Sequence, residues 1–366
     1  MNQWISRVRQ PVKRENAEQY VLIMLLSFAA SVILTRLFLS VTGYPQLGGG
    51  QLHIAHLLWG GLFLFVASLL PLILANRWAL TAGAMLSGTG AGLFIDEVGK
   101  FITRDNNYFY PAAAPIIYAF FLLMVLVYLR VRRPPALDAR SELYRVFEDM
   151  QEVLDRDLDR QERADVEARL GRIVEQKGHP DLAHLAGELH RFLESGDVHM
   201  VDRQPGVWER LITRWQVLQA RWLTRRRLKL VLTVGLAALS VQSLFDPVVV
   251  GLTLLLPADW DRWLPRLVAL GRVSSTSGLM GFRLQLALEG AVSILMLTGC
   301  VLLIIRRERL GVLFGYFGLL LSLTTVNLLV FFFEQFSTVA LALVQFGLLM
   351  GVIHFRRHYL APVRQK

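Results

Sequence analysis

Long apolar stretches separated by short polar ones dominate this chain of 366 residues. Eight of the stretches come close to or exceed the roughly 20 apolar residues that a helix needs to cross a bilayer. We place these spans at residues 20–41, 52–74, 78–101, 112–129, 228–245, 284–305, 312–333 and 338–355. The first stretch is too long for a cleaved signal peptide, so we interpret it as a retained helix. The pattern therefore predicts an all-α protein, a polytopic transmembrane helix bundle of about eight spans.

A polar segment in the middle of the chain divides the spans into two sets of four. The composition changes abruptly at Pro134 and Pro135. We predict five parts: a cytoplasmic N-terminal segment (1–19), a first four-helix transmembrane half (20–131), a cytoplasmic helical insert (132–226), a second four-helix transmembrane half (227–357) and a cytoplasmic tail (358–366).

Apolar residues recur at helical spacing in the insert, which predicts a bundle of three or four helices. The predicted apolar faces comprise Leu143, Phe147, Met150, Leu154 and Leu158; Leu170, Ile173 and Val174; Leu182, Leu185, Leu189, Phe192 and Leu193; and, on a last interfacial helix, Trp208, Leu211, Trp215, Leu218 and Trp222. No heptad pattern runs for the three or more repeats that a coiled coil needs. A homodimer or a protein partner bound through the insert is a hypothesis that this pattern leaves open.

The net charge of +10 and the sequence pI of 10.1 suggest nucleic acid as a partner until the charges are placed on the chain. The insert holds 17 basic and 18 acidic residues, whereas the rest of the chain holds 22 and 11. Most of these 22 flank the same ends of the alternating spans, which indicates the cytoplasmic side. We therefore predict a multi-pass protein of the cell inner membrane, with both termini cytoplasmic, the lipid bilayer as its partner and no nucleic acid. Residues 257–283 depart from this pattern and are typical of a helix lying on the membrane surface.

The two sets of spans show a weak likeness to each other. The fourth and eighth spans align without gaps, and the third and seventh pair Glu97 with Glu334. Transporters are often built from duplicated halves. A parallel four-plus-four repeat is one interpretation, and a chance likeness between apolar helices is the other.

Ionisable residues inside apolar spans are expensive unless they are paired or hydrated, so their positions indicate function. In the predicted topology they gather near the outer face on six helices. The polar cluster comprises Arg36, His53, His56, Asp96, Glu97, Lys100, Asp246, Glu289 and Glu334.

The densest part of this cluster is the sequence LHIAHLLWGG followed by GTGAGLFIDEVGKFITRDNNYFYP. His53 and His56 are three residues apart, so on one helix they share a face, as two ligands of one ion would. Together with Asp96 they are the candidate ligands of a divalent metal ion. A stripe of Ala84, Gly88 and Gly92 leads to Asp96 at steps of four residues and permits close helix contact.

Ordinary structural roles stand beside this hypothesis. Asp96 and Lys100 are four residues apart and can neutralise each other at a helix end. The small-residue stripe can serve packing alone, and a histidine in the first turn of a span can bond water. We expect the loop 104–111, rich in turn formers and aromatic residues, to cap the cluster from outside.

The HIxH pair followed by GxGLxxDEVGKF resembles a group of uncharacterised prokaryotic multi-pass integral membrane proteins. The resemblance covers residues 52–111 and implies no known activity, so it assigns no role to any residue.

Three functions remain open. The first is transport of an ion or small solute. The second is a metal-dependent intramembrane enzyme that acts on a lipid or lipid-linked substrate, with Glu97 as general base. The third is a non-catalytic sensor or assembly component. The single cysteine, Cys300, excludes an internal disulfide and a CxxC redox pair, and the motifs of soluble catalytic sites are absent.

Overall fold

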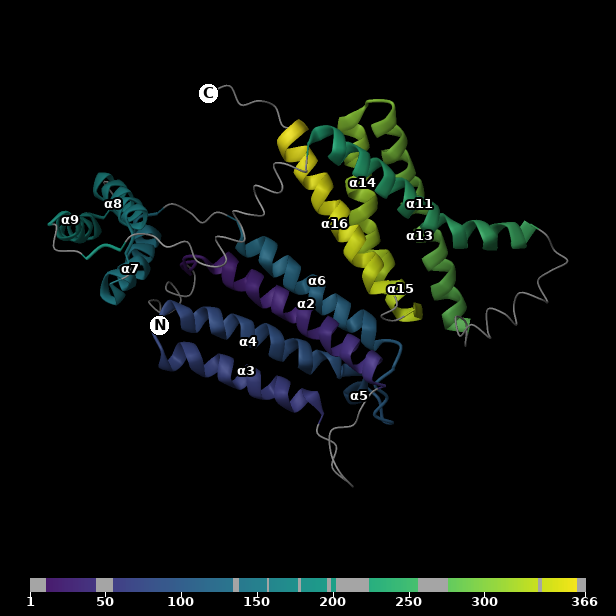
Figure 1. Cartoon of the computed structure of the whole chain (residues 1–366), viewed down its shortest axis with the longest axis horizontal. Coiled ribbons are helices and arrows are strands. Elements are labelled where there is room, and N and C mark those ends of the chain that lie inside the picture. The colour runs from purple at the N-terminus through teal and green to yellow at the C-terminus, as the bar shows by residue number, and fades with distance from the viewer. Residues whose placement is uncertain are drawn as a thin grey trace. The chain divides into compact units, whose positions relative to one another are not determined.

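In the computed structural model, every regular element of the described residues is a helix (Figure 1). The described residues are 11–43, 55–133, 138–156, 158–176, 179–195, 199–201, 224–255, 276–334 and 338–360. The chain divides into two units, Met1–Ile95 with Leu123–Arg210, and Asp96–Leu122 with Leu211–Lys366. We consider each unit by itself.

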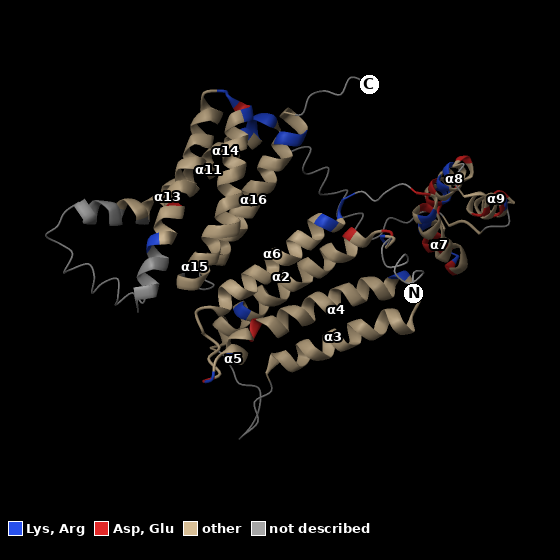
Figure 2. Cartoon of the chain, turned by 180° about the vertical axis from the view of Figure 1, so that it is seen from behind, with Lys and Arg blue, Asp and Glu red and all other residues tan. Residues whose placement is uncertain are grey.

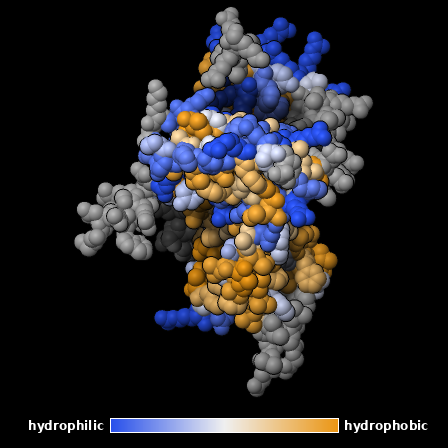
Figure 3. Space-filling model, turned by 90° about the vertical axis from the view of Figure 1, so that its left-hand side faces the viewer, coloured by the Kyte–Doolittle hydropathy of each residue, from blue (hydrophilic) through white to orange (hydrophobic). Residues whose placement is uncertain are grey.

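Eight helical segments of the described chain are long and apolar enough to span a membrane, which confirms the predicted number. They are Ala17–Thr42, His56–Ile73, Arg77–Asp96, Ala113–Val131, Arg225–Phe245, Arg283–Ile304, Glu308–Phe333 and Val339–Leu360. Figure 2 shows Lys and Arg gathered at helix ends and long stretches of each span without charge. The face in Figure 3 is largely hydrophobic over one broad area, as lipid-facing helices require. Exposed side chains such as Leu34, Leu72 and Ile73 belong to this kind of surface.

Three helix boundaries differ from those predicted. The third span ends as α4 (Arg77–Asp96), and a separate five-residue helix, α5 (Val98–Ile102), follows it. The fifth belongs to α11 (Arg225–Leu255), so Asp246 lies inside this helix and does not end it. Pro247 also lies inside α11. Proline is tolerated within membrane helices because neighbouring helices can compensate for its missing N–H group. The sixth belongs to α13 (Thr276–Ile304), which places Glu289 near the middle of a helix.

Glycine residues bring α4 into close contact with α2 (Ala17–Thr42) and α3 (His56–Ile73) in the first unit. A Cβ atom at Gly88 would lie 2.2 Å from the Met24 carbonyl oxygen, and one at Gly92 would lie 2.8 Å from the Ser31 Cβ. On another face, a Cβ at Gly60 would lie 2.8 Å from the Gly90 carbonyl oxygen. The small-residue stripe predicted on the third span is therefore a packing surface.

The second unit is a ring of helices. In this ring α11 contacts α13, α13 contacts α14 (Glu308–Leu321), and α16 (Val339–Phe355) contacts both α14 and α11. Its apolar core includes Leu232, Leu236, Met296, Leu303 and Leu319. Here glycines join α13 to α14, whereas in the first unit they join α4 to two helices. The four-plus-four repeat stays a prediction.

The seventh span also departs from a continuous α-helix. After α14 the chain forms a π-helix, η2 (Ser322–Val326), and then α15 (Asn327–Glu334). A second π-helix, η4 (Arg356–Leu360), follows α16. The last long apolar element of the first half, α6 (Ala113–Val131), belongs to both units.

The insert contains a bundle of three described helices, α7 (Ala139–Asp155), α8 (Arg160–Glu175) and α9 (Pro180–Glu194). Asp159 caps α8 by accepting hydrogen bonds from the main-chain N–H groups of Gln161 and Glu162. The core of the bundle confirms part of the predicted apolar faces: it consists of Ala139, Leu143, Val146, Leu158, Val166, Leu170, Ile173, Ala186 and Leu193.

Two predicted core positions of α7 are wrong. Phe147 and Leu154 are 49% and 83% exposed, because α8 and α9 cover the side of α7 that carries Val146. The predicted interfacial helix with Trp208 and Trp222 lies outside the described residues, as does the surface helix expected before the sixth span.

Candidate functional site

The break between α4 and α5 forms the densest polar site of the predicted cluster. Glu97 leaves the α-helical conformation, with φ −89° and ψ 8°, between the last residue of α4 and the first of α5. Gly99 in α5 is in close contact with the following loop: a Cβ there would lie 2.8 Å from the Asn107 carbonyl oxygen and 2.9 Å from that of Tyr108. The loop therefore turns back across α5, and this contact requires glycine.

Three hydrogen bonds fix the loop in this turn. The Thr103 hydroxyl donates to the Gly99 carbonyl oxygen (2.7 Å) and accepts from the Asn107 N–H group (2.8 Å). The Asn107 side-chain oxygen accepts from the Phe109 N–H group (2.9 Å), as in an Asx turn. These bonds position Tyr108 between them, with its side chain toward the end of α4.

Two buried carboxylates meet a phenol and an ammonium group here. The Tyr108 hydroxyl donates to Asp96 Oδ2 at 2.6 Å, and Lys100 Nζ lies 2.9 Å from Glu97 Oε1. Lys100 Nζ is also 5.4 Å from the centroid of the Tyr108 ring. Asp96 and Glu97 are 0% and 1% exposed, so both acids lie in the protein interior. We call Asp96, Glu97, Lys100 and Tyr108 the carboxylate site.

The structure thus brings three predicted cluster residues together, Asp96, Glu97 and Lys100. Lys100 forms an ion pair with Glu97, three residues away. The loop does supply a cap for the cluster, as expected, through the Tyr108 bond to Asp96. Sequence reasoning placed Tyr108 only within an aromatic loop, because the close contact at Gly99 is not visible in a residue pattern.

The structure describes two of the three predicted metal ligands, His56 and Asp96. Helix α3 begins at His56, and Ala55 before it has extended backbone (φ −71°, ψ 142°). His53 lies outside the described residues. The described part of the chain contains no group of three His, Cys, Asp or Glu side chains that could hold a metal ion. His56 and Arg36, in α3 and α2, belong to the first unit, whereas Asp96 belongs to the second.

Of the remaining cluster residues, Glu289 is the one whose side chain is described. It is buried in α13 and accepts a hydrogen bond from Gln285 Nε2 at 2.8 Å. Asp246 lies within α11 and Glu334 ends α15, and the side chains of both lie outside the described part.

A polar contact that the sequence did not suggest surrounds the π-helix. The Tyr118 hydroxyl donates to the Leu323 carbonyl oxygen at 2.5 Å, and its ring packs on Phe331 with centroids 4.7 Å apart. Next to it, the buried Asn327 Nδ2 donates to Gln345 Oε1 at 2.8 Å. A π-helix displaces main-chain carbonyls from their usual partners, and such turns are frequent at functional sites. These residues are uncharged, so the positions of charged residues in the sequence do not indicate this contact.

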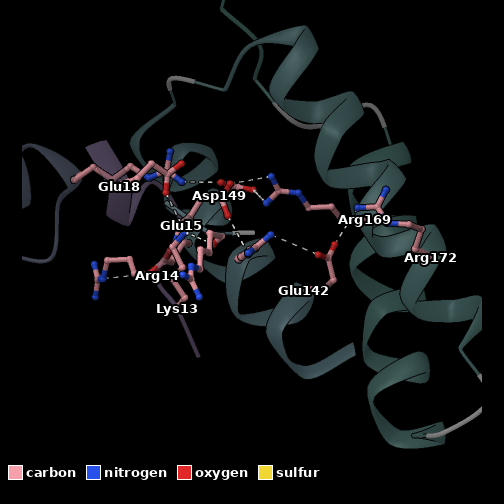
Figure 4. A network of polar contacts seen from close by, with 12 residues as sticks. Lys13, Arg14, Glu15, Glu18, Glu142, Asp149, Arg169 and Arg172 are labelled. Carbon is pink, nitrogen blue, oxygen red and sulfur yellow. Dashed lines mark hydrogen bonds and ion pairs between the residues drawn. The ribbon is translucent and has the colours of Figure 1, made fainter. Parts of the chain in front are cut away.

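An extended ion-pair network joins the insert to the first transmembrane half (Figure 4). Arg77, the first residue of α4, pairs with Asp149 (2.7 Å) and with Glu152 on α7. Arg169 on α8 pairs with the same Asp149 and with Glu15, each at 3.0 Å. Arg77, which the charge pattern assigned only to orientation, therefore also anchors the insert.

Burial changes the titration of two acids in this network. Burial raises the pKa of Asp149 above its ordinary value, and its hydrogen bond to Arg77 opposes that rise. Burial also raises the pKa of Glu152 to about 7, against the attraction of Arg77 and with the help of the nearby carboxylates Glu162 and Asp149. Glu152 is therefore an acid of the insert that titrates near neutral pH.

The resemblance suggested by the HIxH and GxGLxxDEVGKF motifs stays a prediction. Comparisons of this chain with protein-family models, with curated proteins and with solved structures found no match.

Proposed function

We propose that this multi-pass membrane protein transports an ion or a small solute, and that the carboxylate site binds it. The observation that carries the proposal is the pair of buried carboxylates, Asp96 and Glu97, at the break between α4 and α5, where the third span ends. Ionisable residues inside membrane helices mark substrate or ion pathways. Irregular backbone in a span is tolerated where it is buried in protein or lines a cavity.

A break in the α-helix of the seventh span supports this interpretation. The seventh span contains η2, and it occupies the same place in its set of four as the third span does in the other set. Interruptions in corresponding spans of two halves are typical of transporter binding sites. The site has two carboxyl groups and one lysine, so it favours a cation or a proton over an anion.

Flux measurements on the full chain in proteoliposomes test the proposal. Liposomes are loaded with a pH-sensitive dye, and gradients of Na⁺, K⁺ or Mg²⁺ are imposed in turn. We expect a proton flux that depends on the protein with at least one of these cations, and its loss in Glu97→Gln. A matched control is Glu308→Gln, because Glu308 pairs with Arg225 and Lys229 at the start of α11 and lies far along the chain from the site.

The same experiment separates the alternatives. Absence of flux with all three gradients contradicts transport of these ions. If Glu97→Gln alters thermal stability but no flux is found for the unmodified protein either, a structural or sensory role explains the site better. A lipid-modifying enzyme predicts a changed lipid species in the liposomes, which mass spectrometry of the extracted lipids detects.

We also propose that the protein resides in the cell inner membrane with both termini and the insert in the cytoplasm. The ion pairs of Arg77, the first residue of α4, with Asp149 and Glu152 of the insert support this orientation, because Arg77 is one of the basic residues that flank the spans. In a Cys300→Ser background, Asp105→Cys and Ser195→Cys each introduce a single thiol. A membrane-impermeant maleimide added to intact cells should label Asp105→Cys and leave Ser195→Cys unlabelled, and the reverse result refutes the orientation.

A further inference from the structure

Helix α13 carries a buried polar pair within the core of the second unit. Gln285 and Glu289, one turn apart, are 3% and 8% exposed. The same face continues with Val292, Met296 and Leu303, which belong to the apolar core. The pair therefore lies among packed helices and is shielded from lipid and water.

One acceptor of this pair, on Gln285, lacks a donor in the described part of the chain. Gln285 Nε2 donates to Glu289 Oε1 at 2.8 Å. Gln285 Oε1 is buried and has no hydrogen-bond partner among the described residues. A buried acceptor without a donor costs about 1–3 kcal/mol. A carboxylate offers only acceptors, whereas a protonated carboxyl group offers one O–H donor.

We propose that Glu289 and Gln285 form a proton-binding site. The proton resides on Oε2 of Glu289, and this O–H group donates to Gln285 Oε1 while Gln285 Nε2 donates to Glu289 Oε1. Proton uptake forms one O–H bond, takes the proton from water and neutralises the charge of Glu289. The proposal is independent of transport, because it concerns only the protonation state and partner of one acid.

The burial of Glu289 supports a neutral acid. Moving an ionised carboxylate into an apolar interior costs so much that such groups bind a proton instead. The nearby hydroxyl of Ser293 donates to the main-chain oxygen of Glu289 at 2.7 Å, so it is already used by the backbone.

Besides Glu289, charged residues lie on α13 itself and on α11, α14 and α15, which pack against it. On α13 itself, Arg283 is exposed. In η2 and α15 the one charged residue is Glu334, whose side chain is not described. The charged residues of α14 are Glu308 and Arg309 in its first turn, where Glu308 pairs with Arg225 and Lys229. On α11, Pro247 Cβ lies 4.0 Å from a Cβ built at Gly290, which brings the backbone next to Asp246 close to Glu289. Asp246, whose side chain is not described, is therefore the second acid to test.

Infrared difference spectroscopy of the purified full chain in lipid nanodiscs at neutral pH tests the site. The spectrum of the unmodified protein should contain a carboxylic-acid C=O band that is lost in Glu289→Gln and shifts in D₂O. In Gln285→Leu the band should persist but move to higher wavenumber, because the acid loses its hydrogen-bonded partner. Asp246→Asn and Glu308→Gln are the matched controls, and both should retain the band.

Each other result overturns the proposal. If Glu289→Gln removes no acid band, Glu289 is ionised. If Gln285→Leu leaves the band in place, Gln285 is not the partner, and loss of the band in Asp246→Asn assigns the proton to Asp246. A second measurement does not depend on any variant folding: a hydrophobic carbodiimide, which reacts with protonated carboxyl groups, should modify Glu289 at least severalfold more than Glu308 by peptide mass spectrometry. Equal modification of the two contradicts the site.

Discussion

Substitution of Glu152 by glutamine tests how the insert is held on the first transmembrane half. Glu152 lies on α7 and pairs with Arg77 of α4, and burial raises its pKa from 4.5 to about 7. A raised pKa means that the folded chain holds this proton more tightly than the unfolded chain does. The associated stability is fully present below about pH 4.5 and is lost as the pH rises through about 7.

The size of the effect follows from the same pKa. A rise from 4.5 to about 7 corresponds to at most about 3.4 kcal/mol. The Glu152 side chain is partly exposed and solvent screens its interactions, so we expect about 1–2 kcal/mol. Glutamine has the same shape and is always neutral. Glu152→Gln should therefore stabilise α7 by this amount at pH 8 and abolish the loss of stability between pH 5 and pH 8.

Hydrogen–deuterium exchange of the full chain in nanodiscs measures this stability locally. At pH 8, peptides from α7 should exchange about 5–30 times more slowly in Glu152→Gln than in the unmodified protein. The control is Glu175→Gln, since Glu175 is exposed at the end of α8. Faster exchange in Glu152→Gln at pH 8 would refute the reasoning, because it would show that the ion pair with Arg77 outweighs the cost of burying the charge.

Three further substitutions test the packing and the polar contacts, each by thermal unfolding of the purified chain in detergent. Gly88→Ala should destabilise the protein by about 1–3 kcal/mol, because its Cβ would lie 2.2 Å from the Met24 carbonyl oxygen. Gly61→Ala, whose Cβ would have no atom within 4 Å, should be neutral, and equal effects of the two would contradict the α2–α4 contact. Tyr118→Phe should lower the stability by about 1–2 kcal/mol because it removes the donor to the Leu323 carbonyl oxygen, and Tyr144→Phe on the exposed part of α7 should leave the stability unchanged. An unchanged unfolding temperature in Tyr118→Phe would show that the π-helix does not need this bond. Lys100→Gln should lower the stability by about 3 kcal/mol because it removes the cation beside the buried Glu97, and adding Glu97→Gln should recover most of that loss. A double variant less stable than Lys100→Gln would contradict the pairing.

The sequence predicts the spans well because bilayer thickness sets a minimum apolar length, and each of the eight predicted runs overlaps one spanning segment. It does not predict the end of α4 at Asp96, since that end depends on a loop that turns back onto Gly99. Nor does it predict η2, because an apolar run has the same composition in an α-helix and a π-helix. On α7, Val146 and Phe147 are both apolar, and the neighbouring helices decide which of them is buried.

The distribution of buried polar groups separates the two transmembrane units. Within the described spans of the first unit, Ser31 is the one buried polar side chain, and glycines bring the helix backbones into close contact. In the second unit several buried polar side chains bond to another side chain: Glu97 to Lys100, Glu289 to Gln285 and Asn327 to Gln345.

Buried polar side chains bond to each other because an unpaired polar group in the interior is costly. In a low-dielectric interior, a polar group that loses its partner costs more than the bond contributed when intact. Removing one member of a pair should therefore destabilise the second unit more than replacing both members by apolar residues of similar volume. A ligand or proton that temporarily takes over one partner would be stabilised by the same imbalance. The buried pairs of the second unit are consequently the positions at which binding would favour one arrangement of the helices over another.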